Sequence, residues 1–280
     1  MFNTYPVSKH LRPYVSFFYD FDWDEKDYEN GIKELILPSG QGFMVFQTHG
    51  RFRGLLGSVE VPVPQYYTIG QQTRTYTLFT NHEKLGIIGA ALTPTGIYKL
   101  FGICMEDMVN RPTPTRNLFG SDFDLFCKEF ENIKGIKERI TLIEKLLETR
   151  LDKVTVANSI VDLSIDLMNK SLGCLPINHI SKSLNISLRY FQKKFKEIVG
   201  VSPSVYNRIV RFNNLFSEYD LKTSTDYKVI SALFEYYDYS HFHRDFKKYC
   251  GETPKAFHIE KFNFIKEAFV NNPIFLQRIK

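Results

Sequence analysis

The sequence of 280 residues predicts an α+β protein, in which an antiparallel β-barrel or sandwich with a few helices precedes an all-helical domain. Three observations lead to this class. Short runs of β-prone residues fill the first half, apolar residues recur at helical spacing from about residue 121, and one helical segment is repeated 51 residues later. The length suits about two domains, since domains commonly hold on the order of 100–200 residues.

Six runs rich in Ile, Val, Tyr, Phe and Thr are expected to form strands: 32–37, 42–48, 59–63, 66–69, 75–80 and 85–92. Prolines and glycines separate them, as in Pro38-Ser39-Gly40. Segments 96–101 and 106–110 are expected to form short helical turns. Many short strands joined by such turns are typical of an antiparallel barrel or sandwich.

The first half is also rich in aromatic residues, and two interpretations of them stay open: they form the core, or some of them line an apolar ligand pocket. The set is Phe17, Phe18, Tyr19, Phe21, Trp23, Phe43, Phe46, Tyr66, Tyr67, Tyr76 and Phe79. Three arginines, Arg51, Arg53 and Arg74, either face an anion inside the barrel or lie on its surface. His10, His49 and His82 form no His-x-His pair, so we expect no metal site.

Helical spacing begins with apolar residues three or four apart: Phe123, Phe126, Phe130, Ile133, Ile136, Ile140, Ile143, Leu147 and Leu151. A break is expected near Gly135. The stripe from 133 to 151 either pairs with a second copy of the chain or packs on its own barrel. A further stripe runs from 156 to 167. We therefore expect a β-rich domain at 1–152 that ends in a helical hairpin, a helical domain at 153–260 and a helical tail at 261–280.

Composition excludes several classes of protein. Hydrophobic residues make up 43% and charged residues 24%, as in ordinary globular domains. There is no apolar run of the roughly 18–20 residues that a membrane span needs, and the N-terminus lacks the pattern of a secretory signal. The four cysteines form no CxxC pair, which disfavours a zinc cluster or a disulfide scaffold. We expect a cytoplasmic protein without cofactor.

Positive charge is concentrated in the second half. Residues 1–160 hold 18 basic and 19 acidic residues, whereas residues 161–280 hold 18 basic and 12 acidic residues. Such an imbalance indicates a polyanionic partner for the second half, although a solvated cationic surface produces the same excess.

The repeat aligns 187–206 with 238–257. Aligned positions keep two Phe four residues apart, then a Gly, then a Pro: Phe191, Phe195, Gly200 and Pro203 in the first copy, Phe242, Phe246, Gly251 and Pro254 in the second. Ser187 and Asp238 are good helix N-caps, the Phe pairs mark the buried face, and the glycines end the helix. Shorter apolar helices are expected before each copy, at 177–184 and 229–233. Each half of the repeat is therefore a helix-turn-helix unit.

The outer face of each capped helix carries hydrogen-bond donors: Arg189, Gln192, Lys193 and Lys196 in the first copy, and Ser240, His243, Arg244 and Lys247 in the second. Arg, Gln and Lys are side chains that contact base edges and phosphates in the major groove. These eight residues are the predicted contacts to double-stranded DNA, with Arg189 and Gln192 the candidates for base recognition. A cationic face exposed only to water is the competing interpretation.

Residues 177–257 resemble the DNA-binding domain of the AraC/XylS family of transcription regulators. The resemblance rests on 180–187, 189–196, Gly200-Val201-Ser202-Pro203, Arg211-Phe212, 238–247 and Gly251-Glu252-Thr253-Pro254. It implies seven helices, with two helix-turn-helix units joined by a central helix at about 202–217. It also implies that both recognition helices enter successive major grooves, about 34–36 Å apart. An activator of this family also contacts RNA polymerase.

The front half has a looser resemblance, through 11–15, 37–40 and 92–97, to a sensor domain found in part of this family. It implies a cupin-like barrel that binds an effector, forms a homodimer or does both. We therefore predict a sequence-specific transcription regulator, not an enzyme, controlled by an effector or partner at its N-terminal domain.

Three positions depart from the family pattern: Glu235 replaces a Gly, Ser231 an Ala, and Leu215 a small Ala. Glu235 costs stability if that turn needs a positive φ, so the second unit is the weaker part of the match. The alternative function is a ligand-binding or catalytic barrel attached to a degenerate DNA-binding domain. No phosphate-loop, dinucleotide or nucleophile-elbow motif supports the catalytic version.

Overall fold

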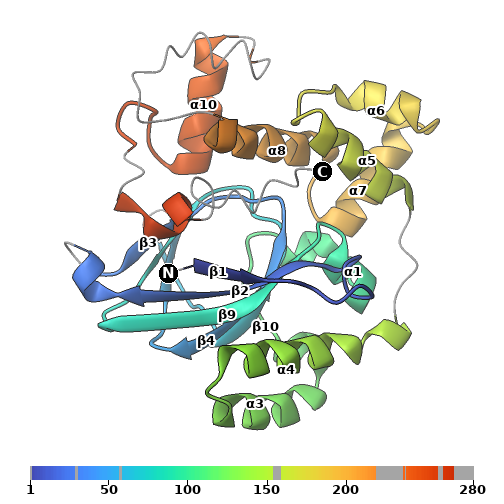
Figure 1. Cartoon of the computed structure of the whole chain (residues 1–280). Helices are drawn as coiled ribbons and strands as arrows, with labels where there is room; N and C mark the ends of the chain where they lie inside the picture. The colour runs from blue at the N-terminus through green and yellow to red at the C-terminus, as the bar shows by residue number, and fades with distance from the viewer. Residues whose placement is uncertain are drawn as a thin grey trace.

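The computed structural model describes residues 2–28, 31–56, 59–153, 159–218, 236, 238–257 and 261–267. It confirms the α+β class: antiparallel sheets form the first part and helices the rest (Figure 1). The helical half lies on one side of the sheets, and a helical hairpin covers the opposite side.

Two antiparallel sheets build the barrel. The larger has the order β1 (Phe2–Tyr5), β2 (Val15–Asp24), β9 (Lys84–Leu92), β4 (Gly42–His49), β7 (Tyr66–Ile69) and β10 (Thr113–Pro114). The smaller has the order β3 (Lys33–Ile36), β8 (Tyr76–Phe79), β5 (Arg53–Leu56) and β6 (Val59–Val61). The six expected strands coincide with β3, β4 and β6 to β9, whereas β1, β2, β5 and β10 were not predicted.

The larger sheet is buried on both faces. Successive side chains of a strand point to opposite faces, so Tyr19, Phe21 and Trp23 of β2 face the smaller sheet and Phe18 faces away. On the outer face, the ring of Phe46 lies 5.2 Å from the rings of Phe126 and Phe130. This double burial explains why β9 is an almost continuous apolar run.

The outer face is covered by α3 (Asp122–Asn132) and α4 (Ile136–Glu148), which are separated at Gly135 as expected. Ile140, Ile143 and Leu147 of α4 are at most 7% exposed and pack with Phe46 and Ile88 in one cluster. Of the two interpretations of the apolar stripe, packing on its own barrel is the one that the structure shows. The stripe is therefore not a free surface for pairing with a second copy.

Smaller elements connect the sheets. They are η1 (Glu25–Asp27), α1 (Gly96–Phe101), η2 (Met105–Met108), α2 (Arg116–Phe119) and η3 (Leu151–Lys153). The two helical turns expected at 96–101 and 106–110 correspond to α1 and η2.

The helical half contains α5 (Ser159–Lys170), α6 (Ile177–Ser183), α7 (Leu188–Val199), α8 (Pro203–Glu218), α10 (Tyr239–Cys250) and α11 (Asn263–Ile265). The central helix expected at about 202–217 is α8. Part of the expected domain boundary, the helix at 229–233, Ser231, Glu235 and the tail from 268 lie outside the described residues, as does the side chain of Leu215.

Candidate nucleic-acid interface

The recognition helix of the first unit, α7, begins and ends through local contacts that the sequence predicted. The Ser187 hydroxyl oxygen accepts a hydrogen bond from the backbone N–H of Tyr190 at 3.2 Å. Gly200 follows the helix at a φ of 94°, where a side chain is strained. Phe191 and Phe195 are fully buried, with ring centroids 5.7 Å apart. These contacts fix which face of α7 is turned outward.

The second recognition helix, α10, repeats this construction. Asp238 accepts a hydrogen bond from the backbone N–H of His241 at 2.7 Å, and Gly251 ends the helix at a φ of 77°. Phe242 and Phe246 are buried, with ring centroids 5.7 Å apart. The two helices have the same length of 12 residues. The repeat in sequence is therefore a repeat in structure at the level of cap, buried face and helix end.

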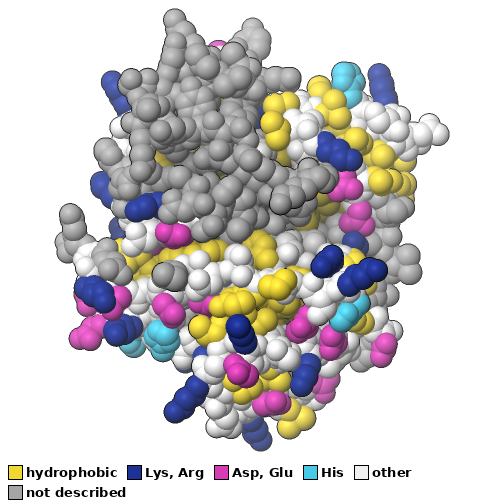
Figure 2. Space-filling view, viewed as in Figure 1, with side chains coloured by type: hydrophobic (Ala, Val, Ile, Leu, Met, Phe, Trp, Pro, Cys, Tyr) yellow, Lys and Arg dark blue, Asp and Glu magenta, His cyan; other side chains and the backbone are white. Residues whose placement is uncertain are grey.

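The structure places the eight predicted DNA contacts as two quartets, one on each helix. Arg189, Gln192, Lys193 and Lys196 of α7 are exposed, and so are Ser240, Arg244 and Lys247 of α10. His243 is half-buried, with its ring 5.8 Å from that of Tyr239. On the face of the barrel that Figure 2 shows, Lys and Arg are scattered among acidic side chains rather than gathered into one patch. The paired cationic faces on α7 and α10 are therefore the candidate site.

One member of the first quartet has a partner that the sequence did not predict. The ammonium of Lys196 forms an ion pair with the carboxylate of Glu106 in η2. Next to it, a Cβ at Gly200 would lie 2.6 Å from the carbonyl oxygen of Met105. The C-terminal end of α7 is therefore docked on the barrel domain, and the ammonium of Lys196 is already paired with a carboxylate.

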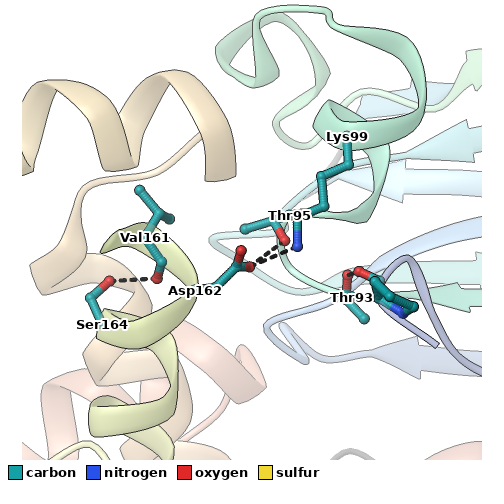
Figure 3. Close-up of polar contacts among 7 residues, drawn as sticks. Thr93, Thr95, Lys99, Val161, Asp162 and Ser164 are labelled. Carbon is teal, nitrogen blue, oxygen red and sulfur yellow. Dashed lines mark hydrogen bonds and ion pairs between the residues drawn. The ribbon is translucent and has the colours of Figure 1, made fainter. Parts of the chain in front are cut away.

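A second polar joint links α5 to the barrel domain (Figure 3). Asp162 accepts hydrogen bonds from the Thr95 hydroxyl at 2.8 Å and from Lys99 Nζ at 2.9 Å. The Lys99 side chain is 12% exposed, so this ion pair is shielded from water more than an ordinary surface pair. The first helix-turn-helix unit is thus held against the barrel through two ionic contacts.

The barrel contains two neighbouring cavities, which share Tyr67, Ile69, Tyr76 and Leu78 in their walls. The smaller, of about 50 Å³, lies among aromatic and aliphatic side chains. The larger, of about 460 Å³, includes Arg74 in its wall. Burial raises the pKa of Tyr76 to about 12, so its hydroxyl stays protonated between the two cavities.

The three arginines considered as anion ligands differ in where they lie and in what they contact. Arg74 is exposed and lies at the wall of the larger cavity. Arg53 stacks on the Phe79 ring at 4.5 Å and is 3.7 Å from the Glu60 carboxylate, and Arg51 donates to the carbonyl oxygen of Gly50. Arg51 and Arg53 therefore stand on the surface, engaged by their neighbours.

Within the described ranges, every helix is too short or too polar to span a bilayer. The same residues bring together no group of three or more His, Cys, Asp or Glu side chains able to hold a metal ion.

Comparison with known families identifies the helical half. A family described as a helix-turn-helix domain matches residues 180–258, which include both capped helices. Residues 180–258 therefore belong to a helix-turn-helix family of the AraC type. A helix-turn-helix domain of this type binds DNA, which agrees with the DNA-binding function predicted from the sequence. Residues 3–114 match a family described only as a domain of unknown function.

Solved structures similar to this chain include ToxT from Vibrio cholerae. One ToxT structure is 12% identical, covers 85% of this chain and 95% of its own, and has a TM-score of 0.43. Another holds (E)-4-(8-methylnaphthalen-1-yl)but-3-enoic acid; it is 13% identical, covers 90% of this chain and 96% of its own, and has a TM-score of 0.44. No curated protein matches the chain.

Proposed function

We propose that the protein binds its operator with α7 and α10 in two major grooves on one side of the DNA. The observation that carries this proposal is the duplicated helix, since each copy has the same cap, the same buried Phe pair and an outward donor-rich face. Arg189 and Gln192 are assigned to base edges, and Ser240 and His243 face the second groove. The proposed phosphate contacts are Lys193, Lys196, Arg244 and Lys247.

The test is selection of bound DNA from a random pool by the full-length protein over a salt series. Enrichment of two half-sites about one helical turn apart supports reading by both helices. Enrichment of one short half-site, or of none, contradicts it. The double variant Arg189→Ala, Gln192→Ala should lose specificity at the first half-site, since a good bidentate contact discriminates by about 1–3 kcal/mol. Unchanged specificity in that variant contradicts the assignment of these two residues.

We further propose that a ligand in the barrel controls the affinity for DNA. Two features support this. The barrel contains cavities, and Glu106 of its η2 segment forms an ion pair with Lys196, one of the proposed phosphate contacts. A change in the barrel that moves η2 therefore changes the availability of a phosphate contact. The direct measurement is the DNA dissociation constant of the full-length protein with and without candidate ligands.

Two further partners, a second copy of the chain and RNA polymerase, remain predictions. A homodimer must use a surface other than the buried stripe of α4, and sedimentation velocity at micromolar concentration tests whether one forms. Transcription in a purified system with RNA polymerase tests the other partner. Because its target is genomic DNA, we expect the protein to act in the cytoplasm.

A further inference from the structure

The smaller barrel cavity contains a side chain from the C-terminal part of the chain. Phe264 of α11 lies in its wall together with Phe2 and Trp23. The Phe264 ring is 5.9 Å from the ring of Phe2 and 5.8 Å from that of Phe21, both of which belong to the larger sheet. In Figure 1 the short red turn of α11 lies between α10 and the barrel, close to β3. A residue beyond both helix-turn-helix units thus fills part of the barrel interior.

A buried carboxyl group holds this segment in place. Glu34 of β3 is 0% exposed, and its Oε1 accepts hydrogen bonds from Trp23 Nε1 at 3.0 Å and from the backbone N–H of Phe264 at 3.1 Å. The Tyr28 hydroxyl donates to the same oxygen. The other oxygen, Oε2, has no hydrogen-bond partner among the described residues. Because three donors occupy Oε1, Oε2 is the oxygen that either carries the proton of neutral Glu34 or, in the ionised form, accepts from a further donor.

The other side of α11 belongs to the second DNA-binding unit. Ile265 is fully buried in a cluster that joins Leu35 and Leu37 of the barrel domain to Phe246 and Tyr249 of α10. Phe262 stacks on Phe257 with ring centroids 5.9 Å apart. Consequently α11 cannot leave the barrel without disturbing the packing that supports α10.

We propose that the smaller cavity is a ligand site that Phe264 occupies in the free protein, and that its ligand is a single-ring aromatic amine or alcohol that displaces Phe264 and donates to Glu34. Binding then removes α11 from the barrel and alters the support of α10. The inference deepens the proposed control by a barrel ligand, since it names the site, the chemistry and the DNA-binding unit that responds.

Size and polarity define the ligand class. The cavity of about 50 Å³ together with the volume vacated by a benzyl group accommodates one ring and a short chain. The walls are almost wholly aromatic and aliphatic, which favours an apolar ring. A ligand that replaces Phe264 also takes away the N–H that Phe264 gives to Glu34, so it must supply a donor of its own.

The chain carries its own probe of this site. Trp23 is the single tryptophan, lies in the cavity wall and donates to Glu34. We would titrate the full-length protein with 2-phenylethylamine and 2-phenylethanol and record Trp23 fluorescence, with ethylbenzene as the compound that lacks a donor. Saturable changes with the amine or the alcohol at lower concentration than with ethylbenzene are expected. No saturable change, or an equal response to all three, overturns the ligand class.

Competition by α11 is tested with two variants of the same segment. Phe264→Ala should bind the probe about tenfold more tightly, because apparent affinity rises with the fraction of molecules in which the site is open. Phe262→Ala, which removes a ring outside the cavity wall and leaves Phe264 in place, should raise probe affinity less than Phe264→Ala does. If both variants behave like the unmodified protein while remaining folded by circular dichroism, Phe264 does not occupy a ligand site. Glu34→Gln should lose the preference for amine over ethylbenzene, and retention of that preference overturns the role of Glu34.

Measurement of DNA affinity in the presence of the probes distinguishes the ligand site proposed here from the broader proposal that a barrel ligand controls DNA binding. If the probe binds and the affinity for the second half-site changes, both stand. If the probe binds with Phe264-dependent affinity and the DNA dissociation constant is unchanged, the ligand site stands and effector control through it is wrong. If DNA affinity responds to another compound while Trp23 does not respond to the probes, effector control stands and the proposed site is wrong.

Discussion

The two DNA-binding units present the same recognition helix and are attached to the barrel by different chemistry. Besides apolar contacts with Tyr98 and Val109, the first unit is held by two ion pairs: Lys196 of α7 pairs with Glu106, and Asp162 of the adjacent α5 pairs with Lys99. The unit of α10 is held by apolar side chains, through the cluster that contains Leu35, Leu37 and Ile265. Salt and charge should therefore act mainly on the first unit, whereas an apolar ligand should act mainly on the second.

The largest expected effects test whether the two buried faces are equivalent. Phe195→Ala and Phe246→Ala each remove a fully buried ring, and such changes typically cost about 3–5 kcal/mol. If the units are equally well packed, the two variants should lose similar unfolding free energy in urea. The same Phe→Ala change costs less where neighbouring side chains move in to fill the space that the ring leaves. A difference of more than about 2 kcal/mol between the two variants would therefore show that one unit fills this space more readily than the other.

A second prediction concerns pH and the support of α10. Burial raises the pKa of Glu34 to about 7, although the hydrogen bonds from Tyr28, Trp23 and the Phe264 backbone favour the ionised form. The folded protein therefore keeps a proton that the unfolded chain releases near its ordinary pKa of 4.5. The free energy of unfolding should be highest below that value, fall by about 3 kcal/mol as pH rises to about 7, and stay level above it.

The matched control for this pH dependence is Glu34→Gln, which keeps an acceptor and cannot titrate. Its unfolding free energy, measured in urea from pH 4 to 8, should lack the fall seen in the unmodified protein. Identical pH profiles for the two proteins would show that the titrating group lies elsewhere.

The glycines that end α7 and α10, Gly200 and Gly251, allow the same substitution to be compared in the two units. Both have a positive φ, for which an L-residue costs about 1–2 kcal/mol. A Cβ at Gly200 also approaches the Met105 carbonyl oxygen to 2.6 Å, whereas at Gly251 the nearest atom is Thr75 Oγ1 at 3.7 Å. Gly251→Ala should thus cost only the backbone strain, and Gly200→Ala distinctly more. Thermal unfolding of the two variants measures the difference, and equal losses would mean that α7 is not docked on η2.

The smallest expected effect tests the ion pair between Lys196 and Glu106. Glu106→Gln should tighten DNA binding about two- to fivefold at low salt, because an exposed pair is typically worth about 0.2–1 kcal/mol. The gain should shrink as salt screens the charges. Lys247 occupies the equivalent position on α10 and forms no ion pair among the described residues, so it offers no comparable gain. Fluorescence anisotropy with operator DNA provides the measurement, and a weaker complex in Glu106→Gln contradicts the competition.

Features set by neighbouring residues were predictable. The caps at Ser187 and Asp238, the inward Phe pairs and the glycines that end each helix all follow from local hydrogen bonding and helical periodicity. The break at Gly135 and the helical turns beyond Pro94 follow in the same way. Because all of these signals are local, the amino-acid sequence alone suffices to orient the eight candidate DNA contacts.

One strand was missed although a signal was present. From Tyr19 to Asp24 the residues of β2 alternate between aromatic and Asp, which is the two-residue period of a strand with one buried face. The preceding Phe17 and Phe18 obscured the alternation, because this end of the strand is also covered by the helices on the outer face.

Contacts between distant segments left no local pattern. Glu106 and Lys196 are ninety positions apart, and the sequence around either residue does not predict that the two form an ion pair. Phe264 and Glu34 are separated by 230 positions, and no residue beside either one indicates the other. Which apolar or charged residue meets which partner across such separations depends on the packed fold.

The joint between Asp162, Thr95 and Lys99 limits how freely this regulator can be rebuilt from interchangeable modules. A chimera that exchanges about the first 150 residues for another sensor domain replaces Thr95, Lys99 and Glu106. Asp162 and Lys196 stay and lose the residues with which they pair. An engineered biosensor built on this fold must therefore transfer the barrel residues together with Asp162 and Lys196. In natural relatives, substitutions at these paired positions are expected to covary.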